Sequence, residues 1–427
     1  MALPLSILMF AIIAVLHTMF LPNIFSRWLA ATSVISSSSK HSHQPLLRVN
    51  EKNEFQITIF SDLHYGEEES GWGIDQDVSS TKVMNAVLNY EESDFVVLNG
   101  DLITGENTFL TNSTSYLDII VEPLVQRKIT WASTYGNHDS QFNLSRTALF
   151  AQENKYDLSY TRSSPKGVAG VTNYYLPVYP REENCHGTAS TSCAPLAILW
   201  FLDSQGGAPF QNPPGSEQIP DWVDPSIVEW FTAESNSVTK KYKKVIPSIV
   251  FVHIPPSAFL TVQETLLPNV GDESVHFPGL NDDVPLARQG DGWQDEGFMK
   301  ALREVRGVHS VFSGHDHGEG WCANWPGGED NGKVERESGS GKGKGRGPHL
   351  CFCKHSGYGG YGNWKRGVRV VKLGFEGVSG YGGGKGETGE MDVETWVRME
   401  SGKVVQRVGL NETYGIDVYP LEDGEED

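Results

Sequence analysis

Short apolar runs recur along the chain, and amphipathic stretches lie between several of them. The runs occupy residues 55–60, 94–100, 129–136, 196–204, 246–254 and 308–314. They are rich in β-branched and aromatic residues, which is typical of strands buried on both faces. Stretches with helical character cover residues 82–90, 116–126, 225–239 and 296–305, and residues 367–373 and 393–399 again resemble strands. The pattern predicts an α/β fold.

Polar clusters follow most of these runs directly. In chain order they are FSDLH (Asp62, His64), LNGD (Asp101), YGNHD (Asn137, His138, Asp139), FVH (His253) and SGHDH (His315, His317). In α/β sheets the loops at the carboxyl ends of strands converge, and ligands bind there. We therefore expect these side chains to meet in one site.

The first two clusters are ambiguous when each is taken alone. Asp62 and His64 are separated by one residue, so in an extended chain both project to the same side and could bind one cation. A surface strand end is the commoner meaning of such a pair. Gly100 allows a tight turn before Asp101, whose two oxygens could bridge two metals, although a Gly-Asp pair is usually only a turn.

The remaining clusters carry similar alternatives. Asn137 can ligate through its amide oxygen, which leaves His138 uncoordinated and able to donate a proton, but a Gly-Asn turn with a helix N-cap at Asp139 fits the same letters. His253 alone is more often a core histidine. His315 and His317 form a stronger pair of imidazole ligands, with a polar strand end as the alternative.

Taken together, the five clusters supply a mixed nitrogen and oxygen ligand set, which suits Zn, Fe or Mn. The formal net charge of −20 and the pI near 5.1 argue against a nucleic-acid binder held by phosphate contacts. The HExxH, GxSxG and GxxxxGK[ST] patterns are absent from the sequence, which excludes the commonest metalloprotease, hydrolase and nucleotide-loop interpretations.

The composition divides the chain into segments. Residues 1–45 contain an apolar stretch followed by a Ser-rich one, which predicts a cleaved signal peptide or a signal anchor in the membrane. Residues 46–420 are expected to form a single domain. Within it, residues 326–348 are rich in Gly, Lys and Glu and should form a surface insertion, and residues 421–427 form an acidic tail.

Sequons and cysteines favour the secretory pathway, with the chain either secreted or anchored with its catalytic domain in the lumen. Asn112, Asn143 and Asn411 each begin an Asn-x-Ser/Thr sequon. Among the five cysteines, Cys185 can pair with Cys193 across one loop. Cys322 can pair with Cys351 or Cys353, and we expect Cys351.

The order Asp-x-His, Gly-Asp, Gly-Asn-His-Asp, His, Gly-His-x-His resembles the pattern of calcineurin-like metallophosphoesterases over residues 55–317. The FSGHDH motif and the later LCFCKHSGYGGYGNW block look most like fungal and plant enzymes grouped with the purple acid phosphatases. This resemblance implies a four-layer α/β/β/α sandwich. It also implies a phosphoesterase that holds two divalent metal ions, Mn, Zn or Fe, and acts on a phosphorylated substrate.

The resemblance also assigns roles. Asp62, His64 and His317 would hold the first metal, Asn137, His253 and His315 the second, and Asp101 would bridge them. A hydroxide between the ions would attack phosphorus in line. His138 would protonate the leaving group or stabilise the transition state. The alternative function is a catalytically silent glycoprotein that uses the fold as a binding scaffold.

Two departures from the family pattern qualify these roles. Purple acid phosphatases have a tyrosine three residues after the bridging aspartate, where this chain has Thr104, and they usually lack a ligand at the position of His64. We therefore expect a colourless enzyme. Protein phosphatases of the superfamily orient the equivalent of His138 with an aspartate that GDLITG lacks, so its partner is Asp139 or a remote residue. His355 and Tyr358 either line the pocket rim or belong to a structural loop.

Overall fold

The computed structural model describes residues 44–185, 193–213, 215–267, 276–326, 347–375 and 391–420. Nearly all of the expected leader (1–45) and surface insertion (326–348), and the whole acidic tail (421–427), lie outside these ranges. Within the described ranges, no helix has the length and apolar character needed to cross a membrane.

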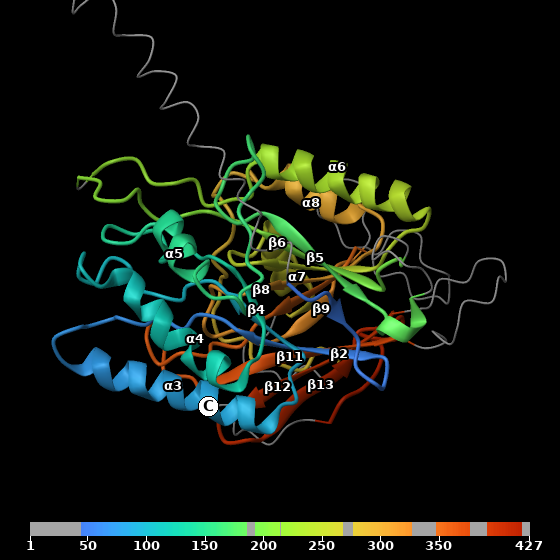
Figure 1. The fold of residues 1–427 in the computed structure, drawn as a ribbon, viewed down its shortest axis with the longest axis horizontal. Helices are drawn as coiled ribbons and strands as arrows, with labels where there is room; N and C mark the ends of the chain where they lie inside the picture. The colour runs from blue at the N-terminus through green and yellow to red at the C-terminus, as the bar shows by residue number, and fades with distance from the viewer. Residues whose placement is uncertain are drawn as a thin grey trace, which may run out of the picture. The chain divides into compact units, whose positions relative to one another are not determined.

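Two mixed sheets form the centre of the domain (Figure 1). The seven-stranded sheet has the order β1 (Leu47–Arg48), β5 (Tyr174–Tyr179), β6 (Ala197–Leu202), β7 (Ser248–Val252), β8 (Val308–Ser313), β10 (His349–Phe352), β9 (Cys322–Asn324). The six-stranded sheet has the order β13 (Val404–Gly409), β12 (Met391–Met399), β11 (Gly367–Phe375), β2 (Glu54–Phe60), β3 (Phe95–Asn99), β4 (Trp131–Thr134). Strands β2, β3 and β4 run parallel to one another, as do β6, β7, β8 and β10.

Helices cover the outer face of each sheet. The helices α3 (Trp72–Tyr90), α4 (Tyr116–Arg127) and α5 (Arg146–Glu153) share an apolar core with the six-stranded sheet. The helices α6 (Pro225–Tyr242), α7 (Ser257–Leu266) and α8 (Glu296–Glu304) share another with the seven-stranded sheet. A third core fills the space between the sheets, and Figure 1 shows α3 and α6 on opposite sides of them. The predicted four-layer α/β/β/α sandwich is confirmed.

Side chains along β2 alternate between the two cores that its sheet separates. Phe55, Ile57 and Ile59 enter the core between the sheets, whereas Phe60 enters the core beneath α3 and α4. Successive side chains of a strand point to opposite faces, so a strand covered on both sides is rich in apolar residues. The polar Gln56 and Thr58, on the same face as Phe60, are hydrogen-bonded to Glu91 and Ser93. The same division holds in β3 and β7. All of the strands expected from the sequence are therefore present.

Other elements were not expected. Strands β1, β5, β9, β10 and β13 and helices α5 and α7 were missed, and α3 begins at Trp72 rather than near residue 82. Only Gly73 and Ser80 are buried in the first half of α3, so that half has no apolar stripe to detect. Strand β5 contains Pro177, and a proline in the sequence argues against a strand.

The described residues contain two disulfides, Cys185–Cys193 and Cys322–Cys351. Both predicted pairings are confirmed. Cys322 and Cys351 lie opposite one another on the antiparallel strands β9 and β10. Cys353 keeps a free, buried thiol.

A buried carboxyl group fixes the strand that leads into the polar clusters. Glu153, at the end of α5, is fully buried and accepts hydrogen bonds from side chains on β4 and on the segment after α5. The donors are Trp131 Nε1 (2.8 Å), Ser133 Oγ (2.8 Å), Tyr135 OH (2.6 Å), Ser159 Oγ (3.0 Å) and Thr161 Oγ1 (2.7 Å). The last residues of β4 are thus held directly before the Gly136-Asn137 turn.

Replacing Glu153 should therefore destabilise the domain. In Glu153→Ala the buried donors lose their shared acceptor, and each unsatisfied polar group costs about 1–3 kcal/mol, so we expect a loss of more than about 3 kcal/mol. Urea unfolding followed by circular dichroism measures the change. The exposed Glu122, on α4, provides the control, and Glu122→Ala should change stability by less than about 0.5 kcal/mol. Equal stabilities of the two variants would contradict this account.

Candidate metal centre

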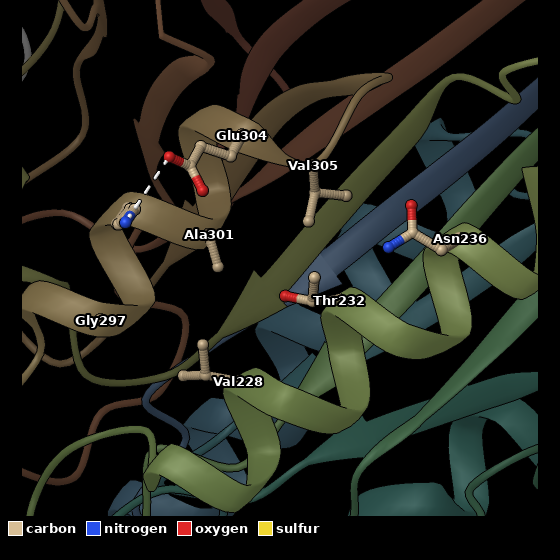
Figure 2. Close-up of a pocket in the computed structure, with 8 residues that line it drawn as sticks. Val228, Thr232, Asn236, Gly297, Ala301, Glu304 and Val305 are labelled. Atoms are coloured by element: carbon tan, nitrogen blue, oxygen red, sulfur yellow. Dashed lines mark ion pairs between the residues drawn. The ribbon is translucent and has the colours of Figure 1, made fainter.

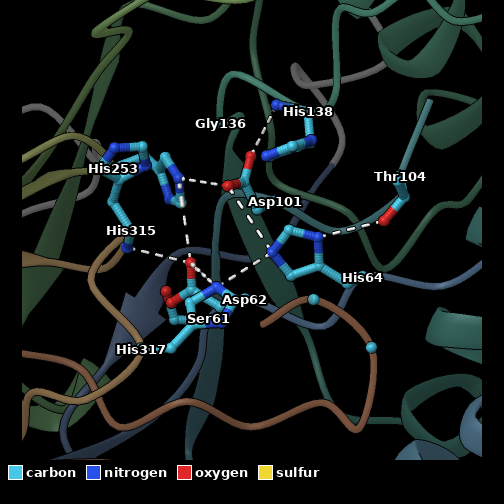
Figure 3. A network of polar contacts seen from close by, with 12 residues as sticks. Ser61, Asp62, His64, Asp101, Thr104, Gly136, His138, His253, His315 and His317 are labelled. Atoms are coloured by element: carbon cyan, nitrogen blue, oxygen red, sulfur yellow. Dashed lines mark hydrogen bonds and ion pairs between the residues drawn. The ribbon is translucent and has the colours of Figure 1, made fainter. Parts of the chain in front are cut away.

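The polar clusters meet where the carboxyl ends of the two sheets come together. Asp62 and His64 follow β2, Asp101 follows β3, and Asn137 follows β4, all in the six-stranded sheet. From the other sheet, His253 follows β7, and His315 and His317 follow β8. Figure 3 shows the labelled carboxylates and imidazoles pointing toward one another. The convergence expected from the positions of the clusters is therefore observed.

Six of these side chains form two groups. The first group consists of Asp62, His64 and His317, and the second of Asp101, His253 and His315. Within each group the ligand atoms lie within 4.8 Å of one another. The Asp101 carboxylate contacts both: its Oδ2 lies 2.9 Å from His253 Nε2 and 3.8 Å from His64 Nε2. Its position between the groups is the one that a bridging ligand requires.

Backbone carbonyls fix the orientation of two imidazoles. His253 Nδ1 lies 2.8 Å from the carbonyl oxygen of Asn99, and His317 Nδ1 lies 2.8 Å from that of Tyr361. A carbonyl can only accept, so each Nδ1 carries the hydrogen and each neutral ring presents the Nε2 lone pair to the centre. This is how metal-ligating histidines are usually held.

At the centre, the buried oxygen atoms Asp62 Oδ2 and Asn137 Oδ1 accept no hydrogen bond. Burying such atoms is costly unless something satisfies them. A cation contacts acceptors only, so the donor set fits metal ions, and the mixture of imidazole, carboxylate and amide oxygen suits Mn, Zn or Fe.

The backbone at the candidate ligands is strained. Asp62, His64, Asp101 and His315 have φ values of 55°, 48°, 48° and 79°. Residues other than glycine are uncommon in this left-handed region, and such strain persists mainly at functional sites. The expectation that Asp62 and His64 lie on one side is correct, but the extended conformation assumed for it is wrong.

Gly100 allows the two sheets to approach at the centre. Its φ is 88°, and a Cβ atom at this position would overlap the imidazole ring of His253. Only glycine combines this φ with so close an approach at low cost. The Gly-Asp pair is therefore more than a surface turn.

Burial and charge set the protonation of the centre in the absence of a cation. Burial lowers the pKa of His315 to about 3 and raises the pKa of Asp62. Burial also opposes charge on Asp101, but His253 and His138 outweigh it and hold the pKa of Asp101 well below its usual range. For His253, burial lowers the pKa, yet Asp101 and Asp62 prevail and raise it to about 9.

His138 lies beside the two groups and pairs with a residue that sequence reasoning missed. Its Nδ1 is 2.7 Å from Glu106 Oε1, and its backbone N–H donates to Asp101 Oδ1 at 2.8 Å. Burial lowers the pKa of His138, but Asp101 and Glu106 outweigh burial and raise it to about 10. Glu106 follows Asp101 in a loop, and no spacing rule in the sequence identified it.

Asp139 is neither the partner of His138 nor a helix N-cap. Its carboxylate accepts from the backbone N–H groups of Leu102, Ile103 and Gly136, at 3.0, 3.1 and 2.8 Å. Residues 137–140 form a turn, and no helix begins at Asp139. Asp139 therefore joins the loop after β3 to the turn after β4, and it fixes Asp101 relative to Asn137.

His355 and Tyr358 do not line the rim of the site. His355 is fully buried, and its ring packs against that of His317 at a tilt of 35°, with 3.9 Å between the ring centroids. The Tyr358 hydroxyl donates to Glu400 instead, at 2.9 Å. The Gly-rich block is thus a structural loop behind the first group of ligands.

A cleft of about 320 Å³ opens beside the second group. It is lined by Asn137, Gly207, Asp221, Ile254, Leu286, Ala287, Arg288, Asp291 and His315. A larger hollow of about 380 Å³ lies between α6 and α8, where Figure 2 shows Val228, Thr232 and Asn236 facing Ala301 and Val305. None of the candidate ligands lines that hollow, whereas Asn137 and His315 line the smaller cleft.

Comparison with known proteins places the chain in a recognisable group. Residues 55–319 match the model of the calcineurin-like phosphoesterase family. Probable inactive purple acid phosphatase 14 of Arabidopsis thaliana is 26% identical over 301 residues, which are 65% of this chain and 69% of that protein. Phosphatase DCR2 of Saccharomyces cerevisiae is 26% identical over 291 residues, 65% of this chain but only 46% of the yeast protein.

Solved structures similar to this chain include a dimetal phosphatase from Danio rerio. It is 14% identical, with a TM-score of 0.47, and the match covers 84% of this chain and 98% of that one. A purple acid phosphatase from yellow lupin is 12% identical, with a TM-score of 0.45 and coverage of 84% and 54%.

Metal ions should stabilise the metal-free protein. Adding Mn²⁺ or Zn²⁺ is expected to raise the melting temperature, because a ligand that binds only the folded state stabilises it. The rise should be larger at pH 8 than at pH 6. Without a cation His253 keeps its proton up to a pKa of about 9, so a metal ion competes with that proton less as the pH rises.

Differential scanning fluorimetry measures this effect, and elemental analysis should find two ions per chain. In His253→Ala, metal ions should raise the melting temperature much less, and elemental analysis should find one ion fewer per chain. His276 provides the control, because its Nδ1 contacts the carbonyl of Asp417 away from the centre. An equal rise in His253→Ala and His276→Ala would contradict a metal site at His253.

Proposed function

The chain belongs to the calcineurin-like phosphoesterase family, and we propose that it is an enzyme that hydrolyses phosphate esters with two divalent metal ions. One observation carries the proposal: two groups of buried ligand atoms share the Asp101 carboxylate, and the paired His138 lies next to them. A purely structural site would not need the histidine outside the ligand groups. The substrate that we favour is a phosphate monoester.

In this proposal one ion would be held by Asp62, His64 and His317 and the other by Asn137, His253 and His315, with Asp101 available to both. The ions are Mn, Zn or Fe in the divalent state, and they supply Lewis acidity and an activated water for attack on phosphorus. A tyrosine that could colour a ferric site is replaced by Thr104, so the purified protein should lack a visible tyrosinate band.

His138 acts as the general acid. With the pKa of His138 raised to about 10 by Asp101 and Glu106 against the effect of burial, its ring is protonated at neutral pH. The Nδ1 hydrogen is directed at Glu106, at 2.7 Å, so the other ring nitrogen is left to donate to the departing oxygen. Glu106 thereby takes the orienting role for which no residue was apparent in the sequence.

The leaving group lies in the cleft beside Asn137 and His315. Arg288 is the only lysine or arginine among the residues that line this cleft. Its guanidinium is held in place by the Ser257 hydroxyl, at 3.0 Å, and by the face of Trp293, 5.0 Å from the ring centroid. A fixed cation at this position supports recognition of an anionic ester.

A binding scaffold without catalytic activity is the second candidate, because the name of the plant relative describes it as probably inactive. The two functions differ in a simple respect. An enzyme needs the His138 side chain, whereas a scaffold needs only the fold.

Turnover of p-nitrophenyl phosphate by the metal-loaded chain without residues 1–45 separates the two candidates. His138→Asn should lower kcat by about 10²–10⁴-fold, the usual contribution of a general acid. Glu106→Gln should lower kcat by a smaller factor, with a similar metal content. The exposed Glu92 provides the control, and Glu92→Gln should have the kcat of the unmodified chain. No turnover with Mn, Zn or Fe would support the scaffold.

We also propose that the chain enters the secretory pathway, where it is secreted or anchored through its N-terminal segment. The two disulfides fit an oxidising compartment. Among the three sequons, Asn411 is the best glycan acceptor. Its side chain is exposed, and its Oδ1 accepts from Thr413 Oγ1 at 2.8 Å, so the amide nitrogen is free to carry the sugar. By contrast, Asn143 Nδ2 donates to the carbonyl of Thr108 at 2.6 Å, and a sugar there would crowd that contact.

Glycosylation can be measured on the chain expressed in a eukaryotic secretory host. Treatment with an N-glycosidase should increase the electrophoretic mobility of the chain and of Asn143→Gln. It should have no effect on Asn411→Gln if Asn411 carries the only glycan. A shift that persists in Asn411→Gln and disappears in Asn143→Gln would contradict the assignment.

A further inference from the structure

A side-chain relay connects His64 to a carboxyl group outside the candidate ligands. His64 Nδ1 lies 3.1 Å from Thr104 Oγ1, and the Thr104 hydroxyl lies 2.5 Å from Glu67 Oε2. Thr104 and His64 are both buried, with 2% and 3% of their surface exposed. Sequence reasoning noticed Thr104 only because a tyrosine was missing there, and Glu67 had no signal at all.

The direction of the hydrogen bonds follows from the chemistry of the groups. A carboxylate can only accept, so the single hydroxyl hydrogen of Thr104 is directed at Glu67. The hydroxyl oxygen then accepts from His64, which places the imidazole hydrogen on Nδ1. His64 Nε2 is left with its lone pair toward the centre, 3.2 Å from Nε2 of His317. Two lone pairs at that distance repel unless a cation lies near both.

Main-chain hydrogen bonds hold the two loops of the relay together. The backbone N–H of Thr104 donates to the carbonyl of Tyr65 at 2.9 Å, and that of His64 donates to the carbonyl of Asp101 at 3.0 Å. The loop after β2, with His64 and Glu67, is therefore joined by its backbone to the loop after β3. A change in the Thr104 side chain can remove the relay without removing these backbone contacts.

His64 differs in this respect from the candidate ligands His253 and His317. The Nδ1 atoms of His253 and His317 are paired with backbone carbonyls, whereas the Nδ1 partner of His64 is a side chain. The orientation of His64 thus depends on the identity of residue 104, and that dependence can be tested by substitution.

We propose that Thr104 and Glu67 are positioning residues of the first metal site, where they fix His64 as a neutral nitrogen ligand. At this position the purple acid phosphatase pattern has an anionic ligand, the tyrosine. Here the residue instead supports an imidazole, so the site offers less negative charge and favours a divalent ion over a trivalent one. The inference rests on the metal sites of the proposed function but not on hydrolysis.

The test compares metal affinity in variants of residue 104. Thr104→Val keeps the shape of the side chain but removes the hydroxyl. We expect it to lower the affinity of the protein for one of the two ions by about 10–100-fold, as loss of such a supporting partner does. Thr104→Ser keeps the hydroxyl and should bind both ions within about threefold of the unmodified chain. Glu67→Gln should lower the affinity for the same ion as Thr104→Val does.

The measurement is competition for Zn²⁺ or Mn²⁺ with a chromophoric chelator, using the full chain freed of metal. Thr108→Val is the matched control: Thr108 is a buried threonine of the same loop whose hydroxyl donates to the carbonyl of Gly105 at 3.0 Å. Melting temperatures of the metal-free variants show whether each one is folded.

The outcomes separate this inference from the proposed function. Unchanged affinity for both ions in a folded Thr104→Val, or an equal loss in Thr108→Val, would overturn the relay. A protein that binds two ions, one of them with an affinity that depends on Thr104, but hydrolyses no phosphate ester would support the relay and reject the proposed function.

Discussion

The burial of carboxylates and imidazoles at the junction of two sheets is the constraint on which the rest of this structure depends. Asp62, Asp101 and His253 are almost completely removed from solvent, and such groups are tolerated only when each is paired or bound to a metal. Much of the surrounding polar structure serves this purpose. Backbone carbonyls hold His253 and His317, and the Asp139 carboxylate holds the loops that carry Asp101 and Asn137.

The centre belongs to neither sheet alone. The six-stranded sheet supplies Asp62, His64 and Asp101, and the seven-stranded sheet supplies His253 and His315. Because each group of ligands draws on both sheets, a cation in either group would tie the sheets together at this edge. The apolar core between the sheets and the polar centre at its rim therefore stabilise the same packing of the two sheets.

Sequence alone predicted most of the strands and most of the residues that meet at the centre, because both are local patterns. A strand covered on both faces is rich in apolar residues, and a functional strand end is polar, so Phe55–Phe60 and Asp62 were both recognisable. Partners such as Glu106 and Glu67 were missed because loop paths, and not chain spacing, bring them to His138 and Thr104. The left-handed backbone of Asp62 and His64 was missed for a related reason, since only tertiary contacts explain why two residues other than glycine adopt it.

The disulfide between β9 and β10 has a consequence for how this domain can vary. Cys322 and Cys351 are 29 residues apart in the sequence, yet they are covalently joined and paired in register. The entropy of closing a loop grows only slowly with its length, and here the ends are already fixed. The connection between these strands can therefore be lengthened, shortened or exchanged during evolution without displacing His317 or His355. For protein engineering, the same property makes it a suitable place to insert a peptide tag or a small reporter domain.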